Sequence, residues 1–275
     1  MISERILRRL MQVPGVRSLW HRFPIGSVDT RVRYGIFSRP HYAYGVYWAA
    51  SLAKSLKLPG ISVIEFGVAG GRGLRALENI AQLIASQMGI RITVAGFDSG
   101  TGLPAPTDYR DLPHVWGRGF YSMDEQKLRA KLLPNTELIL GDVKETVPQW
   151  LSRRAILPLG FVAFDLDYYS STVAAFRIFE TENFNSRLPR VYCYFDDIIW
   201  PEAACHNEYT GELCAIREFN EGHEHKKICP LHRLNRMRVY DERWNDQTYV
   251  LHDFDHPLYC ANVTSAGAAY TEKHL

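Results

Sequence analysis

Residues 61–73 of the chain read ISVIEFGVAGGRG, an apolar run that passes directly into a glycine-rich turn. The run Ile61–Phe66 has the composition of a buried parallel strand. The turn holds Gly67, Gly71 and Gly73, and a helical pattern follows at once. Glycines at such a turn let the backbone come close to a ligand, and they leave the first turn of the helix open to it. This order of strand, turn and helix predicts the ligand-binding start of an α/β fold.

From Ile61 onward, strand-like runs alternate with helix-like segments. The predicted strands are Ile61–Phe66, Ile92–Phe97, Glu137–Leu140, Phe161–Phe164, Val191–Phe195, Leu231–Tyr240 and Gln247–His252. The predicted helices are Leu74–Gln87, Asp124–Leu133, Lys144–Arg153, Ser171–Glu180 and Tyr209–Asn220. Such alternation predicts an α/β fold with a doubly wound, seven-stranded, mostly parallel sheet.

The segment before the sheet differs in charge from the rest of the chain. Residues 1–39 hold eight arginines and two acids, a net charge of +6, which leaves −4 for the remainder. Apolar residues near the start have the spacing of one helix face: Ile6, Leu7, Leu10 and Met11. We expect a basic and aromatic helical arm and cap over residues 1–58, and one ligand-binding domain over residues 59–275. The arm is expected to pack on its own protein or on a second subunit, with membrane-surface or nucleic-acid binding as the weaker alternative.

Composition excludes several classes of protein. With 46% hydrophobic and 23% charged residues among 275, the chain is neither disordered nor a membrane bundle. The longest uncharged apolar stretch is far shorter than the ~20 residues of a membrane span. The cysteines are odd in number and form no CxxC pair: Cys193, Cys205, Cys214, Cys229 and Cys260. This pattern predicts reduced thiols and a cytoplasmic location.

Acidic residues stand at the ends of the first three predicted strands. Glu65 precedes the first glycine by two positions, where it would repel a pyrophosphate but suit the ammonium group of a cofactor that contains an amino acid. Asp98 ends the second strand, a place from which a carboxylate can accept hydrogen bonds from both ribose hydroxyls of an adenosine. Asp142 follows the third strand and is placed to contact the edge of an adenine ring. Each aspartate can alternatively cap a helix or a turn.

Four more carboxylates follow the next two strands. Asp165 and Asp167 come after the fourth strand, and Asp196 and Asp197 after the fifth. Parallel strands end at the same edge of a sheet, so these groups are expected to converge. Like charges at close range are unfavourable unless they are protonated or bridged, and a hard cation such as Mg²⁺ takes oxygen ligands. We expect Asp165, Asp196 and Asp197 to be the metal ligands.

These motifs together carry a resemblance to a known family. The matching segments are Glu65-x-Gly67…Gly73, Phe97-Asp98-Ser99-Gly100, Gly141-Asp142, Asp165-Leu166-Asp167 and Asp196-Asp197. They resemble the class I S-adenosylmethionine-dependent methyltransferases, and within them the macrocin O-methyltransferase group, which methylates sugar hydroxyls of macrolides and related products. The resemblance implies S-adenosylmethionine and a divalent cation as cofactors. The cofactor-binding residues are then expected to be Glu65, Gly67, Gly71, Gly73, Asp98, Ser99 and Asp142.

The expected function is a Mg²⁺-dependent O-methyltransferase that acts on a hydroxyl of a small molecule, a sugar or a glycosylated natural product. Asp165 or Asp167 is expected to accept the hydroxyl proton. The histidines after the fourth strand are further candidate bases, none of them assigned: His206, His223, His225, His232, His252 and His256. One departure from the group is Leu166, which stands where glycine is usual.

Two other functions stay open. An NAD-type or nucleotide-sugar enzyme can use the same sheet, although the pair Asp196-Asp197 argues against it. A non-catalytic partner protein that binds S-adenosylmethionine is the second alternative. A nucleic-acid acceptor is not expected, because Asp165-Leu166-Asp167-Tyr168 stands in place of an Asn/Asp-Pro-Pro-Tyr-like segment.

Overall fold

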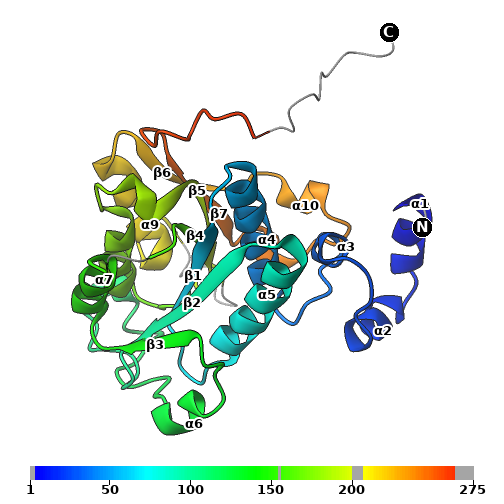
Figure 1. Ribbon diagram of the computed structural model, residues 1–275. Coiled ribbons are helices and arrows are strands. Elements are labelled where there is room, and N and C mark those ends of the chain that lie inside the picture. Colours follow the sequence, from blue (N-terminus) through cyan, green and yellow to red (C-terminus); the bar gives the residue numbers. More distant parts are fainter. Residues whose placement is uncertain (1–3, 154–155, 200–206, 264–275) are drawn as a thin grey trace.

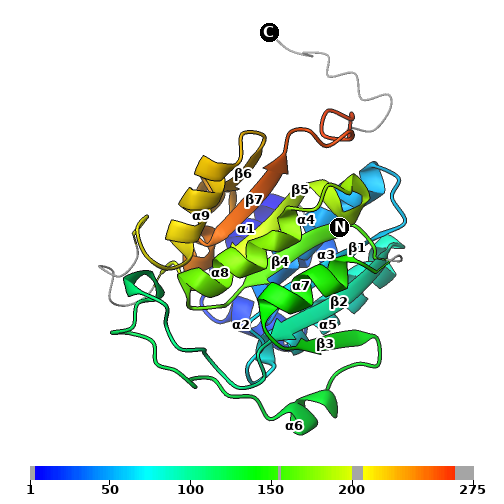
Figure 2. The same ribbon diagram turned by 90° about the vertical axis from the view of Figure 1, so that its left-hand side faces the viewer.

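The structure is a computed structural model that describes residues 4–153, 156–199 and 207–263. Cys205 and His206 lie outside these residues. Within the described part of the chain, seven strands form one sheet with helices on both faces (Figures 1 and 2). The predicted α/β fold with a seven-stranded, mostly parallel sheet is therefore confirmed.

The order of the strands places the ligand-binding edge. The strands are β1 (Gly60–Phe66), β2 (Arg91–Asp98), β3 (Thr136–Leu140), β4 (Leu159–Phe164), β5 (Arg187–Phe195), β6 (Lys226–Pro230) and β7 (Thr248–Asp253). They lie in the order β3-β2-β1-β4-β5-β7-β6, and β7 runs antiparallel to both of its neighbours. After β1 the chain adds β2 and β3 on one side of that strand, and it then adds β4 on the opposite side of β1, so the direction of strand addition reverses there. Ligands bind at such a switch point, beyond the carboxyl ends of the strands.

Helices cover the two faces of the sheet. The helices before β4 are α1 (Glu4–Met11), α2 (Val16–Arg22), α3 (Val28–Arg33), α4 (Pro40–Ser55), α5 (Arg72–Met88), α6 (Glu125–Arg129) and α7 (Val143–Leu151). Those after β4 are α8 (Tyr169–Ala175), α9 (Gly211–Gly222) and α10 (Leu234–Met237). Helices α4 and α5 lie on one face, and α7, α8 and α9 on the other (Figure 2).

The strands alternate their side chains between the two layers, as a two-sided sheet requires. In β1, Ile61 and Val63 pack in the layer beneath α4 and α5, whereas Ile64 and Phe66 pack in the opposite layer. Both layers are apolar, so β1 is buried throughout. This explains why the strand reads as one continuous apolar run, and it holds the turn after Phe66 in a fixed place.

Helix α4 lies against the centre of the sheet. Pro40 occupies its first turn, where the missing amide hydrogen costs nothing. Its backbone comes so close to β4 that a side-chain carbon on Gly45 would lie 2.3 Å from the Phe161 ring. The start of α4 is thereby brought to the cleft at the strand ends. A domain boundary between residues 58 and 59 stays a prediction, but α4 itself belongs to the layered core.

One predicted strand is wrong. The segment 231–240 holds the short helix α10, and the sixth strand lies earlier, at Lys226–Pro230. Apolar residues within 231–237 recur at every third position, a spacing that suits a helix turn better than a strand. The real strand has two lysines and a proline, which conceal it from a hydrophobic pattern. As the edge strand of the sheet it tolerates Pro230, and charges there discourage pairing with other chains.

The N-terminal arm lies at one side of the molecule. Figure 1 shows α1 and α2 outside the layer formed by α3, α4 and α5. Met11 and Trp20 pack with Tyr240, whose hydroxyl donates to the carbonyl of Met11 at 2.6 Å. The predicted short helix before Pro14 is present as α1. None of the helices in the described residues combines the length and apolar character that a membrane crossing requires.

Candidate active site

A cavity of about 890 Å³ opens at the carboxyl ends of the central strands. A volume of this order suits a small-molecule ligand. The cavity is lined by most of the residues singled out from the sequence: Glu65, Gly67, Gly73, Asp98, Ser99, Asp142, Asp165, Asp167, Asp196 and Asp197. Residues from five strand ends, predicted separately, therefore face one space.

The sheet's own hydrogen bonds fix these strand ends relative to one another. The amide of Gly67 donates to the carbonyl of Phe97, that of Asp165 to Phe66, and that of Asp196 to Phe164, each at 2.9 Å. The ladder thus continues one residue beyond the strands. The first acids after β4 and β5 are consequently held in register with the glycine turn.

Two glycines of the turn are required by close contacts. Gly67 has a φ of +82°, and a side-chain carbon there would lie 1.7 Å from the carbonyl oxygen of Asp165. A side-chain carbon on Gly73 would lie 1.7 Å from a carboxylate oxygen of Glu65. Gly71 caps the start of α5 with a φ of +78° and faces Leu128 rather than the cavity. Its predicted contact with a cofactor has no support in this geometry.

The candidate ribose ligand, Asp98, also holds the turn. Its Oδ2 accepts hydrogen bonds from the amides of Val68 and Ala69, both at 2.8 Å, and its Oδ1 accepts from Gly100 at 2.7 Å. A carboxylate can accept about four hydrogen bonds, so Asp98 retains capacity for a ligand. Asp142 caps α7 by accepting from the amide of Lys144 at 2.8 Å. Both aspartates therefore have a structural role and also line the cavity.

Glu65 is buried, and only one of its two carboxylate oxygens has a hydrogen-bond partner among the described residues. It is 1% exposed, and its Oε1 accepts a 2.6 Å hydrogen bond from the hydroxyl of Tyr42 on α4. Its Oε2 is buried and has no hydrogen-bond partner among the described residues. Burial raises the pKa of Glu65 to about 7, against the opposing effect of the Tyr42 hydrogen bond. A buried carboxylate oxygen without a partner is unfavourable unless a ligand supplies a donor.

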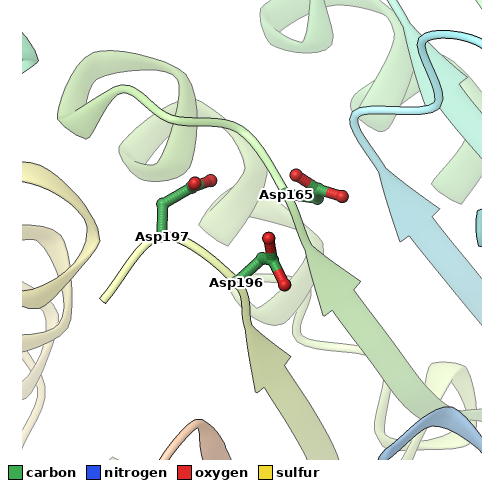
Figure 3. A group of neighbouring side chains, drawn as sticks. All are labelled: Asp165, Asp196 and Asp197. Carbon is green, nitrogen blue, oxygen red and sulfur yellow. The ribbon is translucent and has the colours of Figure 1, made fainter. Parts of the chain in front are cut away.

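Asp165, Asp196 and Asp197 converge on one point (Figure 3). Each can place an oxygen within 4.8 Å of the others, and within the described chain these three form the group that could hold a metal ion. Burial, followed by the charges of the neighbouring aspartates, raises the pKa of Asp165 and of Asp197 well above the usual range. Such crowding fits a hard cation with oxygen ligands. The three predicted ligands thus lie together, and their role in binding a metal stays a prediction.

Asp167 lies beside this cluster. Its backbone is strained, with a φ of +58°, and its amide donates to Oδ2 of Asp197 at 2.9 Å. Burial, together with the charges of Asp165 and Asp196, raises the pKa of Asp167 to about 7. Left-handed backbone at a residue other than glycine is costly and is concentrated at functional sites. This carboxyl group can exchange a proton near neutral pH.

Several residues at the site had no signal in the sequence. Arg39 lines the cavity, and although burial disfavours its charge, the nearby Tyr42 and carboxylates raise its pKa. Tyr194 donates to Oδ1 of Asp196 at 2.7 Å. Glu212 on α9 is fully buried and accepts from the amide of Asp197 at 3.2 Å. In the sequence, Arg39 reads as one of the arm's charges and Tyr42 as a core aromatic.

The candidate histidine bases do not reach the cavity. Those within the described residues are absent from its lining: His223, His225, His232, His252 and His256. His223 is instead within 2.8 Å of the carbonyl of Phe219, and His225 within 2.8 Å of Asp255. The acidic cluster is therefore the better source of a base.

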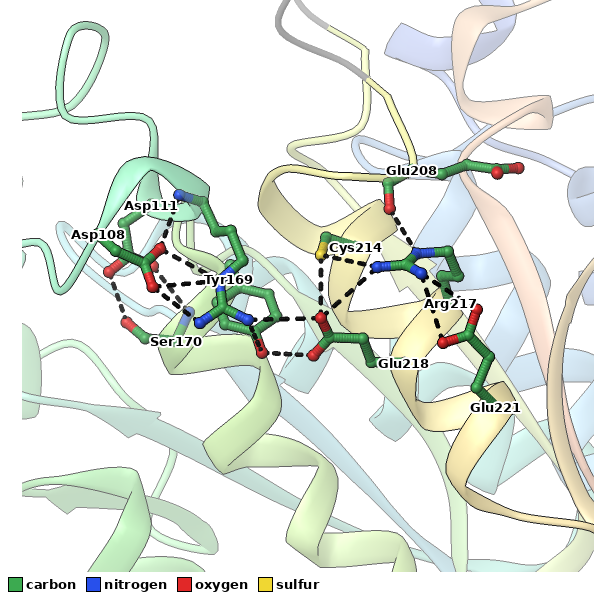
Figure 4. A network of polar contacts seen from close by, with 10 residues as sticks. Asp108, Asp111, Tyr169, Ser170, Glu208, Cys214, Arg217, Glu218 and Glu221 are labelled. Atoms are coloured by element: carbon green, nitrogen blue, oxygen red, sulfur yellow. Dashed lines mark hydrogen bonds and ion pairs between the residues drawn. The ribbon is translucent and has the colours of Figure 1, made fainter.

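The long connection between β2 and α6 is fastened over the acid end of the cavity, where Trp116 and Tyr121 line it. Asp111 is fully buried and accepts from the amide and hydroxyl groups of Thr107 and Ser170, at 2.7–2.9 Å. Beside it, Arg110 contacts Asp108, Tyr169 and Glu218, which ties the connection to α8 and α9. Figure 4 labels these three partners of Arg110. The loop is thus held by specific bonds.

Comparison with known proteins supports the fold. No protein-family model and no curated protein matches the sequence. Among solved structures, the calicheamicin methyltransferase CalS11 is similar with a TM-score of 0.50 and 22% identity, over 90% of each chain. The O-methyltransferase NovP is similar with a TM-score of 0.50 and 14% identity, over 91% of this chain and 99% of that one. The chain therefore has the fold of these methyltransferases, as the resemblance implies.

We expect Asp111→Ala to loosen the loop. The substitution removes the buried acceptor of four hydrogen bonds from Thr107 and Ser170, each of which contributes about 0.5–1.5 kcal/mol or more. Limited proteolysis should then cut within residues 99–123 faster than in the wild type. Glu125→Ala, which removes an exposed ion pair with Arg129 on α6, is the control and should change the cleavage rate little. Equal cleavage of the two variants would contradict the assignment.

Proposed function

We propose that the protein is an S-adenosylmethionine-dependent O-methyltransferase that acts on a hydroxyl of a small molecule with the help of a divalent cation. The observation that carries this proposal is the meeting of two half-sites in one cavity. The glycine turn, Glu65 and Asp98 form one half, and the three-aspartate cluster forms the other. The two solved structures compared above are named as methyltransferases, which agrees with this function.

The residues of the first half fit S-adenosylmethionine. The unpartnered Oε2 of Glu65 is an acceptor for its ammonium group, and Gly67 and Gly73 line the same cavity. Asp98 and Asp142 line the same space and offer acceptors for the ribose and the adenine edge. Ser99 is also in the lining, but its hydroxyl donates to the carbonyl of Gly102 at 2.8 Å.

The second half fits an acceptor hydroxyl held beside a cation. When bound, S-adenosylmethionine supplies an activated methyl group and a divalent cation supplies a positive charge that lowers the pKa of the hydroxyl. Asp165, Asp196 and Asp197 would hold the cation through carboxylate oxygens. The remaining requirement is to orient the hydroxyl oxygen and to remove its proton as the O–CH₃ bond forms and the S–CH₃ bond of S-adenosylmethionine breaks, which leaves S-adenosylhomocysteine.

Asp167 is the better of the two candidate bases. It lies outside the three-aspartate cluster, whereas Asp165 belongs to it and would share its charge with the cation. Asp167 is buried and lines the cavity next to the cluster, where its carboxyl group can accept the proton of a hydroxyl held beside the cation. Asp165 would then serve as a metal ligand, and it could act as a base only when no cation is bound.

A sugar-bearing acceptor is the substrate class that we favour. Trp116 and Tyr121 line the cavity, and aromatic rings suit the apolar face of a sugar ring. Tyr121 lines the same cavity as the acid cluster, and burial, followed by the charges of the aspartates, raises the pKa of its hydroxyl. A nucleotide-sugar or NAD-type enzyme is disfavoured, because its pyrophosphate would meet the carboxylate of Glu65.

The state of the cysteines supports a cytoplasmic location, which is part of this proposal. Within the described residues four cysteines are free: Cys193, Cys214, Cys229 and Cys260. Unpaired cysteines of this kind are typical of reducing compartments.

The first test is calorimetry with S-adenosylhomocysteine. The wild type should bind it, and Asp98→Ala should bind about tenfold more weakly or worse, because hydrogen bonds to a charged group contribute about 1.5–3 kcal/mol. Asp124→Ala is the control, since Asp124 caps α6 outside the main cavity. A wild type that does not bind, or full affinity in Asp98→Ala, would overturn the cofactor assignment.

The second test addresses the cation. Mn²⁺ or Mg²⁺ should raise the melting temperature of the wild type, because a ligand at a hundredfold excess over its Kd stabilises the folded state by about 2.7 kcal/mol. Asp196→Asn and Asp197→Asn keep hydrogen-bond acceptors but remove charge, so the rise should be lost. Glu221→Gln alters an exposed acid elsewhere and should retain it. The metal proposal fails if all four proteins respond alike.

We also propose that the arm contacts a second copy of the chain. Leu19, Phe23 and Ile25 are 62%, 62% and 76% exposed, an unusual density of apolar surface in one segment. The arm's positive charge complements the net negative charge of the remaining chain. Light scattering should find a dimer in the wild type and a monomer in Phe23→Asp. Val173→Asp, on the exposed side of α8, should remain dimeric, and a monomeric wild type would exclude the contact.

A further inference from the structure

The carboxylate of Glu65 is enclosed on one side by two different helices. The hydroxyl of Tyr42 on α4 donates to Oε1 at 2.6 Å. The first turn of α5 packs against the same oxygen, so closely that a side-chain carbon on Gly73 would lie 1.7 Å from it. Oε1 is therefore hydrogen-bonded and enclosed within the protein, and the other oxygen is the one left for a ligand.

That other oxygen, Oε2, is buried and unpartnered among the described residues. Glu65 is 1% exposed and lines the large cavity. The free energy lost by leaving a buried carboxylate oxygen without a donor is recovered when a ligand brings a positively charged donor to it. The unfilled position therefore points to a cationic N–H group as the ligand.

Tyr42 is itself held rigidly. It is fully buried, and its ring lies 5.6 Å from that of Phe161 and 5.9 Å from that of Tyr194, centroid to centroid. The guanidinium of Arg39 lies 5.1 Å from the Tyr42 ring centre. Burial and the nearby carboxylate of Glu65 raise the pKa of Tyr42 well above its usual value, so its hydroxyl stays a donor. A rigid, permanent donor can fix the orientation of the carboxylate that it contacts.

We propose that Tyr42 is a positioning residue of the cofactor site, which holds Oε1 of Glu65 so that Oε2 receives the ammonium group of an S-adenosyl compound. This inference rests on the proposed function. It places the first turn of α4, from the segment before residue 59, in the cofactor site. Tyr42 acts through Glu65 and does not itself contact the cofactor.

The experiment compares two ligands in the variant Tyr42→Phe. S-adenosylhomocysteine carries the amino-acid portion, and 5′-methylthioadenosine has the same adenosine and thioether but lacks it. Calorimetry should find about a tenfold loss of affinity for S-adenosylhomocysteine in Tyr42→Phe and no loss for methylthioadenosine. Tyr47→Phe is the matched control, because Tyr47 lies on the same helix and donates to Asp29, away from the cavity.

A second variant tests whether Tyr42 acts through Glu65. Glu65→Gln should show the same ligand-specific loss, and the double variant Tyr42→Phe/Glu65→Gln should bind S-adenosylhomocysteine no more weakly than Glu65→Gln alone. Additive losses in the double variant would overturn the inference. So would full affinity in Tyr42→Phe, or an equal loss for both ligands, which indicates general damage to the cavity. A wild type that binds neither ligand would instead refute the proposed function on which the inference rests.

Discussion

The turn after β1 and the chain after β4 pass each other at a distance that only glycine permits. A side-chain carbon on Gly67 would lie 1.7 Å from the carbonyl oxygen of Asp165, whose amide in turn donates to the carbonyl of Phe66. This contact locks the glycine turn to the first acid of the three-aspartate cluster. The parallel ladder then transmits the register to β5 and so to Asp196. The geometry of both half-sites depends on this one approach of two backbones.

The same arrangement concentrates negative charge in a small volume. Glu65, Asp165, Asp167 and Asp197 are all held where burial and mutual repulsion raise the pKa of each. Without a ligand, the fold must tolerate this repulsion, and Arg39 offsets part of it. Cationic ligands relieve this repulsion. The repulsion between the buried carboxylates therefore destabilises the empty site and also explains why the site prefers positively charged ligands.

The sequence was most informative where the chemistry sits at strand ends. Continuous apolar runs mark the central strands, and in a parallel sheet their carboxyl ends must share an edge, so the convergence of Glu65 with Asp165 and Asp196 was predictable. The edge strand Lys226–Pro230 was not, because it has one buried apolar side chain and no hydrophobic period. The roles of Arg39 and Tyr42 were hidden for another reason. Their partners lie on other elements of the fold, and helical spacing gives no sign of which core ring carries a buried hydrogen bond.

The position of α4 has a consequence for the order in which parts of the protein fold during synthesis. This helix is made early and packs against the nearby helix α5, yet its contacts with the sheet lie on β1, β4 and β5, the last of which ends about 140 residues later at Phe195. Contacts of such long sequence separation form slowly, because a large loop must be closed before they contribute. On the ribosome, therefore, the first turn of α4 cannot take its native place beside the finished cavity until most of the sheet has emerged. A nascent chain that ends before β5 has the glycine turn but lacks a complete binding site.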